Sequence, residues 1–409
     1  MTGTDAAPPP RGAASDQLLA RVVREESARI VAALTASLRN LDLAEEAVAD
    51  AVEEALREWR LRGVPPNPGG WLTQAARHNA LDRLRRERRY REKLTLLEPA
   101  TSEPELDERL PLLFGCCHPA LSPEAQLALT LRAICGLTTA QIARATLSTT
   151  TAVAQRIVRA KRKIGAAGVP IRIPEGAERS TRLDIVLTVI SVMYAQAHLS
   201  DGGGAAADRD LAEDALWLAR VVSTTLPGEA EAHGLLALLL FHRAREDARA
   251  VDGEIVLLAD QDRGRWDAGM LAEARRELDR AASLRRPGRW QLHAAIAACH
   301  ADAASAAQTD WPQVLVLYDM LLGYDRSPIV RLNRAVALAE VAGPQAARAE
   351  VESLEPALSQ YHLWHAVRAH LLRRMGRTDE ATAADLRALE LTANAAERRL
   401  IAARLARVS

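Results

Sequence analysis

The sequence predicts an all-α protein. Aromatic residues make up only 3% of the 409 residues, and the β-branched alternation that marks strands is scarce. Alanine, leucine and arginine dominate instead, and apolar residues recur at helical spacing. Helices packed through small and aliphatic side chains account for all three observations. The length allows roughly two to four domains, at about 100 to 200 residues each.

The N-terminal end is expected to be a leader followed by two helices. Residues 1–16 contain no apolar run, so we expect a disordered leader rather than a signal peptide. Apolar positions at helical spacing then predict one helix over 18–38 and a second over 44–59.

A loop and a basic helix complete the first predicted domain, which spans 17–95. The segment GVPPNPGG at 63–70 is expected to be an exposed loop, because its prolines and glycines oppose helix formation. A third helix is predicted to begin at Trp71 and becomes strongly basic after Asp82.

A second domain is predicted over 109–170, behind an acidic, proline-containing linker at 96–108. Ser122 is placed to cap a helix whose first turn holds a proline and a glutamate. Gly136 is expected to end that helix.

The next stretch carries the most specific pattern in the chain. Thr138 or Thr139 can cap a short helix, a Ser/Thr turn at 148–151 follows, and a second helix then buries Val153, Ile157 and Ala160. That second helix bears a polar and basic set: Gln155, Arg156, Arg159, Lys161, Arg162 and Lys163. Two short helices joined by a tight turn predict a helix-turn-helix with a recognition helix.

Local charge supports this interpretation. Between Glu124 and Glu175 there are eight basic residues and no acidic one. A positive field of this kind suits a phosphate backbone. The alternative is an ordinary solvated helix face.

The region 175–409 is predicted to be a helical extension built from repeats. The segments 329–354 and 369–391 each place small residues at helix crossings and a glycine in the turn, Gly343 in the first. This pattern is typical of tetratricopeptide-like (TPR-like) hairpins of about 34 residues. Such units bury their apolar faces only by stacking, so the extension is expected to be an α-solenoid, clearest over 329–392.

Several strings together resemble one family. LDLAEEAVADAVEEALREW is similar to region 2.2 of the sigma factors of bacterial RNA polymerase, PNPGGWLTQAARHNALDRLRR to regions 2.3 and 2.4, and QRIVRAKRKI to region 4.2. LLFGCCHPALSPEAQLALTLR, LLADQDRGRWD, QLHAAIAACHA and PIVRLNRAVALAEVAGP resemble segments of one subgroup. The chain therefore resembles the extracytoplasmic-function class of the sigma-70 family, in the subgroup with a TPR-like C-terminal extension.

The resemblance implies core RNA polymerase as a partner, through the β′ coiled coil and the β flap. Region 2.2 would grip the β′ coiled coil with an acidic rim: Glu45, Glu46, Asp50 and Glu53. The sequence departs from the family pattern at Ala49, where glutamine is common, and at Asp50, where glutamate is common. The departure is expected to alter the affinity for core polymerase without abolishing binding.

Regions 2.3 and 2.4 of the family melt the minus-ten promoter element, and a flipped base enters a pocket there. By position, the residues implied are Asn67, Trp71, Arg77, Asn79, Arg83, Arg85 and Arg86. Trp71 could equally anchor the core, and Asp82 and Arg85 could form a surface pair. The arginines from Arg83 onward are expected to hold phosphates rather than to read bases.

Region 4.2 of the family enters the major groove at the minus-thirty-five element. Matching the recognition helix implies Thr150, Thr151, Gln155, Arg156 and Arg159, with Lys161 and Lys163 on phosphates. Glutamine can bond adenine twice and arginine can do so with guanine. Ala152 and Ala154 stand where many relatives have polar or basic residues, which leaves the base preference open.

Other candidate sites are weaker. Cys116, Cys117 and His118 invite a metal interpretation, but adjacent helical cysteines point about 100° apart and no second pair lies nearby, so buried packing is expected. The glycine-rich segment 201–204 lacks the lysine of a P-loop and is expected to be a turn. Residues 260–267 concentrate polar groups near Trp266 and are expected to fix the extension's architecture or its docking.

The predicted function is therefore promoter-specific initiation by a sigma factor, with the extension controlling the sigma part in cis or binding a protein partner. The alternative is a helix-turn-helix regulator with a TPR-like sensor, acting on duplex DNA without joining polymerase. An enzymatic function is not expected, because the sequence shows no catalytic or cofactor-binding motif. No metal or cofactor is expected either. Four scattered cysteines and the lack of an apolar stretch of about 20 residues predict a soluble, cytoplasmic protein.

Overall fold

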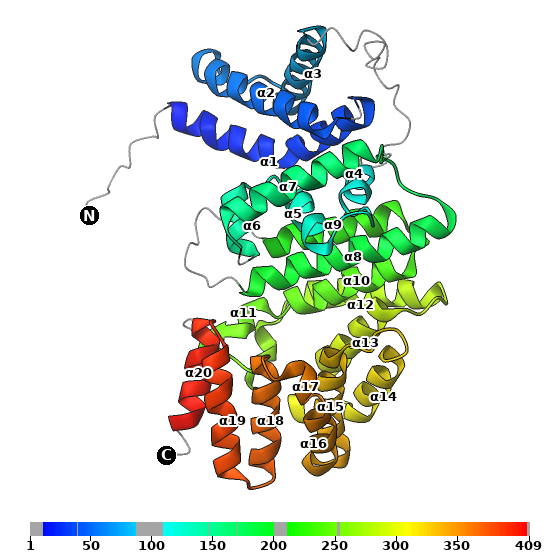
Figure 1. Cartoon of the computed structure of the whole chain (residues 1–409), viewed down its shortest axis with the longest axis vertical. Coiled ribbons are helices and arrows are strands. Elements are labelled where there is room, and N and C mark those ends of the chain that lie inside the picture. Colours follow the sequence, from blue (N-terminus) through cyan, green and yellow to red (C-terminus); the bar gives the residue numbers. More distant parts are fainter. Residues whose placement is uncertain are drawn as a thin grey trace, which may run out of the picture. The chain divides into compact units, whose positions relative to one another are not determined.

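The structure is a computed structural model that describes residues 11–38, 40–86, 109–146, 148–169, 171–199, 211–251 and 254–406. It divides into two units, Met1–Gln196 and Ala197–Ser409 (Figure 1). The described residues are almost entirely helical, apart from a two-residue antiparallel ladder between β1 (Ala250–Val251) and β2 (Glu254–Ile255). The all-α prediction is confirmed.

Three helices open the N-terminal unit: α1 (Arg11–Leu38), α2 (Leu41–Arg62) and α3 (Pro68–Arg86). Each packs on the other two. The sequence pattern placed the start of α1 later, behind a leader of 16 residues. Asp16 instead lies within α1 and pairs with Arg60 of α2 at 2.5 Å, and the hydrogen bond from Arg60 lowers the pKa of Asp16. Residues 1–10 lie outside the described chain.

The start of α3 differs from the predicted loop over 63–70. The helix begins at Pro68 rather than at Trp71, because proline is tolerated in the first turn of a helix, where its missing N–H has no partner to lose. Asn67 fixes this end, since its side chain accepts a hydrogen bond from the Gly70 N–H at 2.9 Å. The tail of the predicted loop is therefore the first turn of a helix.

Four helices follow the undescribed segment 87–108, which contains the predicted acidic linker: α4 (Arg109–Cys116), α5 (Pro123–Ala133), α6 (Thr139–Ala145) and α7 (Thr150–Ala166). Their apolar centre is formed by fully buried side chains from α4 and α5: Leu110, Leu112, Leu113, Phe114, Leu129 and Leu131. Ser122 caps α5 as predicted, and Gly136 follows the helix end with a positive φ of 68°.

The cysteine pair at the end of α4 belongs to this centre. Cys116 and Cys117 are both buried, which confirms the packing interpretation. Burial raises the pKa of Cys117 to about 12, although a hydrogen bond with Thr130 works in the opposite direction. Within the described part of the chain, no three His, Cys, Asp or Glu side chains are grouped so that they could hold a metal ion.

The helix α8 (Gly176–Leu199) is tied to α4 by one buried arginine. Arg182 is 2% exposed, and its guanidinium donates to the Phe114 carbonyl at 2.6 Å and to Glu178 at 3.1 Å. The same guanidinium lies 5.9 Å from the centre of the Phe114 ring. The first turns of α8 therefore pack with the apolar centre that α4 and α5 form.

The C-terminal unit begins with α9 (Leu211–Thr225), α10 (Ala230–Arg243), α11 (Glu246–Arg249), α12 (Ala268–Ser283) and α13 (Arg289–Asp302). Helix α10 is apolar on nearly every face because α9, α12 and α13 all pack against it. His233 on α10 is buried and bonds Glu277 at 2.6 Å and the Pro227 carbonyl at 3.1 Å. It is a packed, hydrogen-bonded residue of the core.

The polar segment around Trp266 connects these helices. Asp262 caps the short helix η3 (Arg263–Arg265), and Asp267 caps α12. Trp266 is 6% exposed, and its ring lies 4.5 Å from the Arg263 guanidinium. Arg263 also donates to the His300 carbonyl of α13 at 2.6 Å. These contacts support the expected architectural role of the segment.

The remaining helices are α14 (Trp311–Leu321), α15 (Pro328–Ala342), α16 (Pro344–Ser353), α17 (Glu355–Leu358), α18 (His362–Arg374), α19 (Thr378–Leu391) and α20 (Ala395–Ala406), joined to α13 through the 3-10 turn η4 (Ala306–Gln308). Each packs mainly on its neighbours in sequence, as Figure 1 shows from yellow to red. Two helical hairpins were predicted here, and both are present. They turn at Gly343 and Gly376, whose φ angles of 89° and 75° favour glycine.

A buried carboxylate joins the last three helices. Asp385 of α19 has no exposed surface, and both of its oxygens accept from arginines: Arg373 of α18 and, at 3.1 Å, Arg404 of α20. A surface pair between Arg399 and Glu254, at 2.7 Å, links α20 to β2.

None of the helices in the described ranges combines the length and the apolar character that crossing a membrane would require.

Candidate nucleic-acid interface

The helix-turn-helix is formed by α6 and α7. Of the two predicted caps for α6, Thr138 serves: its hydroxyl accepts from the Gln141 N–H at 3.2 Å, and the Gln141 side chain accepts from the Thr138 N–H at 2.8 Å. Thr149 caps α7, so the helix begins inside the predicted turn at 148–151 and the connection lies earlier, between Ala145 and Thr150. Thr150 and Thr151 consequently lie exposed in the first turn of α7.

The reciprocal cap gives a stability prediction. Thr138→Ala removes the hydroxyl acceptor of the capping box, and we expect it to lower the free energy of unfolding by about 1 kcal/mol. Thr139→Ala, one residue later, removes no cap and serves as the matched control. Urea denaturation of both variants measures the difference, and equal midpoints would show that the box contributes nothing.

Helix α7 separates an apolar face from a polar one. Val153, Ile157 and Ala160 are buried as predicted, and α7 packs against α5 and α6. The opposite side presents an exposed or half-buried set: Thr150, Thr151, Gln155, Arg156, Arg159 and Lys163. A helix that packs against its own domain on one face and is cationic on the other can lie in a groove of duplex DNA.

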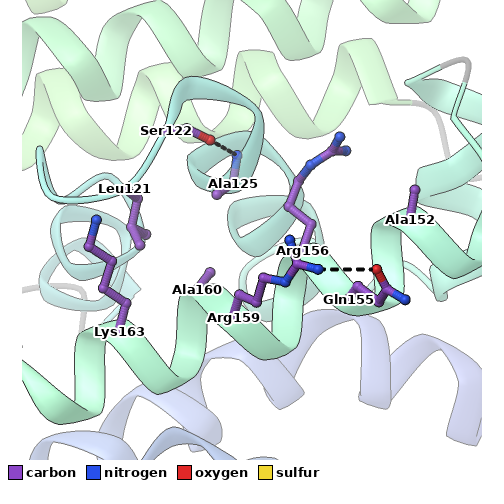
Figure 2. A pocket seen from close by; sticks show the side chains of 9 residues that line it. All are labelled: Leu121, Ser122, Ala125, Ala152, Gln155, Arg156, Arg159, Ala160 and Lys163. Carbon is purple, nitrogen blue, oxygen red and sulfur yellow. Dashed lines mark hydrogen bonds between the residues drawn. The ribbon is translucent and has the colours of Figure 1, made fainter.

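A pocket of about 420 Å³ lies along this polar face, between α7 and the start of α5 (Figure 2). Arg159 donates to the Gln155 side chain at 3.3 Å, while Arg156 extends separately toward α5 (Figure 2). Near it, the pKa of Glu124 is lowered by its own backbone N–H, by the Ser122 hydroxyl and, less strongly, by Arg156. Arg156, Arg159 and Lys163 make the pocket a cationic surface.

Lys161 lies away from this surface. Its side chain is only 13% exposed and pairs with two carboxylates of α2, Asp42 at 2.7 Å and Glu45 at 2.9 Å. Burial alone would lower the Lys161 pKa, but Glu45 and Asp42 outweigh it, so that the pKa is raised. Lys161 is therefore a half-buried cation that faces α2, and the structure does not group it with the other predicted minus-thirty-five residues.

The residues predicted for the minus-ten element are spread along α3. Asn67 and Arg77 are exposed, whereas Trp71 is half-buried, with its ring 5.7 Å from that of the buried Trp59. The amide of Asn79 faces α2, within 3.2 Å of both Glu54 Oε1 and the Ala51 N. Arg85 and Arg86 belong to the last turn of α3, and their side chains lie outside the described residues.

Arg83 joins two predicted sites. Its guanidinium pairs with Glu46 and, at 2.7 Å, with Asp50. Both carboxylates were predicted to face polymerase, and Arg83 was predicted to face DNA. Glu53, the remaining member of the acidic rim, forms an exposed pair with Arg57 at 3.2 Å. The acidic face of α2, defined here as Asp42, Glu45, Glu46, Asp50 and Glu53, is thus lined with cations of the same chain.

Two charged neighbours of Lys161, Asp42 and Arg162, were not among the residues predicted to bind DNA or polymerase. Asp42 became apparent only through its contact with Lys161, which is 119 residues away in the sequence. Arg162 is exposed next to Lys161 on α7. Its position inside a basic run was visible, but helical periodicity alone did not separate it from a solvated surface residue.

Comparisons with known proteins match three segments. Residues 22–90 match the model of sigma-70 region 2, and residues 112–164 match that of sigma-70 region 4. Residues 182–282 match a family of unknown function. An uncharacterized protein of Rhizobium meliloti (strain 1021) is 41% identical over 383 residues, which cover 89% of this chain and 90% of that protein. No solved structure matches the chain.

Proposed function

The chain belongs to the sigma-70 family of RNA polymerase sigma factors, and we propose that it is an extracytoplasmic-function sigma factor whose TPR-like extension regulates it. Regions 2 and 4 imply binding to core RNA polymerase and to promoter DNA. A sigma factor directs initiation without making or breaking covalent bonds itself. The alternative of a simple helix-turn-helix regulator leaves region 2 without a role.

The cationic face of α7 supports the minus-thirty-five part of the proposal. Thr150, Thr151, Gln155, Arg156 and Arg159 would read base edges in the major groove, and Lys163 would hold a phosphate. Lys161 would join the phosphate contacts only after leaving Asp42 and Glu45.

The exposed side of α3 supports the minus-ten part. Asn67, Trp71 and Arg77 would receive the opened strand, since an indole face can stack on a base and a guanidinium can neutralise its phosphates. Arg85 and Arg86 would extend the cationic track along the same helix. Asn79 and Arg83 would take part only if they released their partners on α2.

The acidic face of α2 supports the polymerase part. Glu45, Glu46, Asp50 and Glu53 would pair with basic residues of the β′ coiled coil, and region 4 would contact the β flap. Such pairs accelerate association and fix its orientation. Within the extension, hairpins that turn at Gly343 and Gly376 support a TPR-like solenoid, whose concave surface would bind a protein segment or the sigma part.

Run-off transcription tests the function directly. Purified core polymerase is supplied with a randomised promoter library, with and without the full chain, and the transcripts are sequenced. We expect initiation that depends on the chain and start sites that share two spaced elements. Binding to duplex DNA without any new start sites would contradict the proposal and favour the simple regulator.

A further inference from the structure

We propose that Lys161 is a latch that holds region 4 against region 2 and competes with polymerase for the acidic face of α2. The latch consists of three side chains: Lys161 from the recognition helix, and Asp42 and Glu45 from the start of α2. The Lys161 ammonium lies 2.7 Å from one carboxylate and 2.9 Å from the other. Within the described part of the chain, this ion pair joins α7 to α2.

The low exposure of Lys161 and Glu45 makes their contact stronger than a surface ion pair. The side chains of Lys161 and Glu45 are 13% and 18% exposed, whereas Asp42 is 64% exposed. A pair that is largely removed from water is screened less by salt than an exposed one. Removing one member also leaves its partner buried and uncompensated. The geometry therefore favours the closed arrangement, in which Lys161 of region 4 pairs with Asp42 and Glu45 of region 2.

Two observations show that the contact between α7 and α2 is incompletely packed, which is why we expect it to open. Glu45 Oε1 is buried and has no hydrogen-bond partner among the described residues, so one oxygen of the latch is unsatisfied. A cavity of about 360 Å³ adjoins the latch and is lined by Asn40, Leu112, Cys116, Lys161 and Ile164, among others. Because the contact between α7 and α2 leaves unfilled space, charge carries more of its stability than apolar packing does. Helices α1 and α4 pack against each other separately, so the latch acts in addition to that packing.

The latch and polymerase binding exclude each other on this surface. Glu45 belongs to the proposed polymerase-binding rim, and in the closed chain its neighbourhood is occupied by α7. Lys161 belongs to the proposed DNA-binding helix, and in the closed chain it is turned toward α2. Basic residues of polymerase that took Glu45 would displace Lys161 and free it for a phosphate. This competition rests on the proposed function, whereas the latch itself does not.

The other cation on the acidic face serves as an internal comparison. Arg83 holds Glu46 and Asp50 within region 2, so breaking that contact does not separate the two regions. Lys161, by contrast, connects the acidic face to a helix of region 4. A variant at Asp42 therefore tests the latch, because Asp42 lies outside the proposed polymerase and DNA contacts.

The experiment measures the distance between the two regions in the full chain. Spin labels at Leu61→Cys on α2 and Ala166→Cys on α7 report it by pulsed electron resonance, since both positions are exposed. Cys299→Ser removes the half-buried native thiol, and the three other cysteines are buried. The latch variants are Asp42→Asn and Lys161→Gln. The matched control is Glu58→Gln, which breaks an exposed pair with Arg62 on the same helix.

We expect Asp42→Asn to lower the ratio of closed to open chains about fivefold, which is the effect of one well-placed ion pair, and Lys161→Gln to lower it further. Raising the salt concentration should open the unsubstituted chain more than Asp42→Asn. Glu58→Gln should match the unsubstituted chain. Identical distance distributions in both latch variants and the control would overturn the proposal, provided that circular dichroism shows all of them folded.

A second measurement separates this proposal from the proposed function. The affinity of the full chain for core polymerase should rise in Asp42→Asn and stay unchanged in Glu58→Gln. If transcription depends on the chain but the spin-label distances do not change in the latch variants, the latch is wrong and the sigma function stands. If the distances respond but no transcription is found, the latch stands and the function is wrong.

Discussion

Replacing Arg156 with alanine is expected to lower transcription from the chain's own promoters by about 5- to 150-fold, because a good contact to a base edge contributes about 1 to 3 kcal/mol of discrimination. Arg156 lies on the supported cationic helix α7 and extends along the pocket beside α5 (Figure 2). It is not held by Gln155, unlike Arg159. We therefore expect Arg156, rather than Arg159, to reach a guanine.

The measurement is run-off transcription on the promoters selected in the library experiment, together with variants of each base in the upstream element. We expect the loss to be concentrated at one position of that element, where Arg156→Ala should tolerate other bases. Arg172→Ala serves as the control, because Arg172 is exposed but lies beyond the end of α7. A loss spread evenly over all promoters would mean that Arg156 binds phosphate and reads no base.

Replacing Asp385 with alanine is expected to destabilise the C-terminal unit by about 3 to 5 kcal/mol, since removing one partner of a buried ion pair leaves the other uncompensated. Here two arginines, Arg373 and Arg404, would lose the carboxylate that they share. The three helices α18, α19 and α20 meet at this group. We therefore expect local opening of all three.

Hydrogen exchange read by mass spectrometry locates the effect, and urea denaturation gives its size. Peptides from α18 to α20 should exchange faster in Asp385→Ala, while peptides from α1 to α3 should not change. Glu390→Ala is the matched control on α19, because it removes an exposed pair with Arg387 that is worth at most about 1 kcal/mol. Equal stability of the two variants would contradict the role given to Asp385.

Local features of the fold were predictable because they depend on neighbouring residues. The period of Val153, Ile157 and Ala160 identified the buried face of α7, and Ser122 identified the start of α5. Gly343 marked a hairpin turn for the same reason. Each of these signals lies within one turn of the helix or loop that it determines.

The contacts of the candidate site were less accessible to sequence reasoning. A basic run identified α7 as a cationic helix, but nothing in it distinguished Lys161, whose partners lie more than 100 residues earlier in the chain. Arg83 likewise fits a DNA-binding pattern until its carboxylate partners are known. Pairing over such separations is decided by tertiary packing. Sequence patterns therefore identified the helices of the site better than the individual side-chain contacts.

The anchoring of Arg182 bears on how the extension can be studied. This arginine is the first residue of the segment that matches a family of unknown function, yet its guanidinium is bonded to Phe114 inside region 4. A chain that ends just behind the recognition helix would lack the buried hydrogen bond from Arg182 to the Phe114 carbonyl. If that fragment were inactive, the cause would be damaged folding of region 4 and not the loss of a regulator. A stop codon after Gln196, where the first unit ends, keeps that bond and isolates the regulatory question.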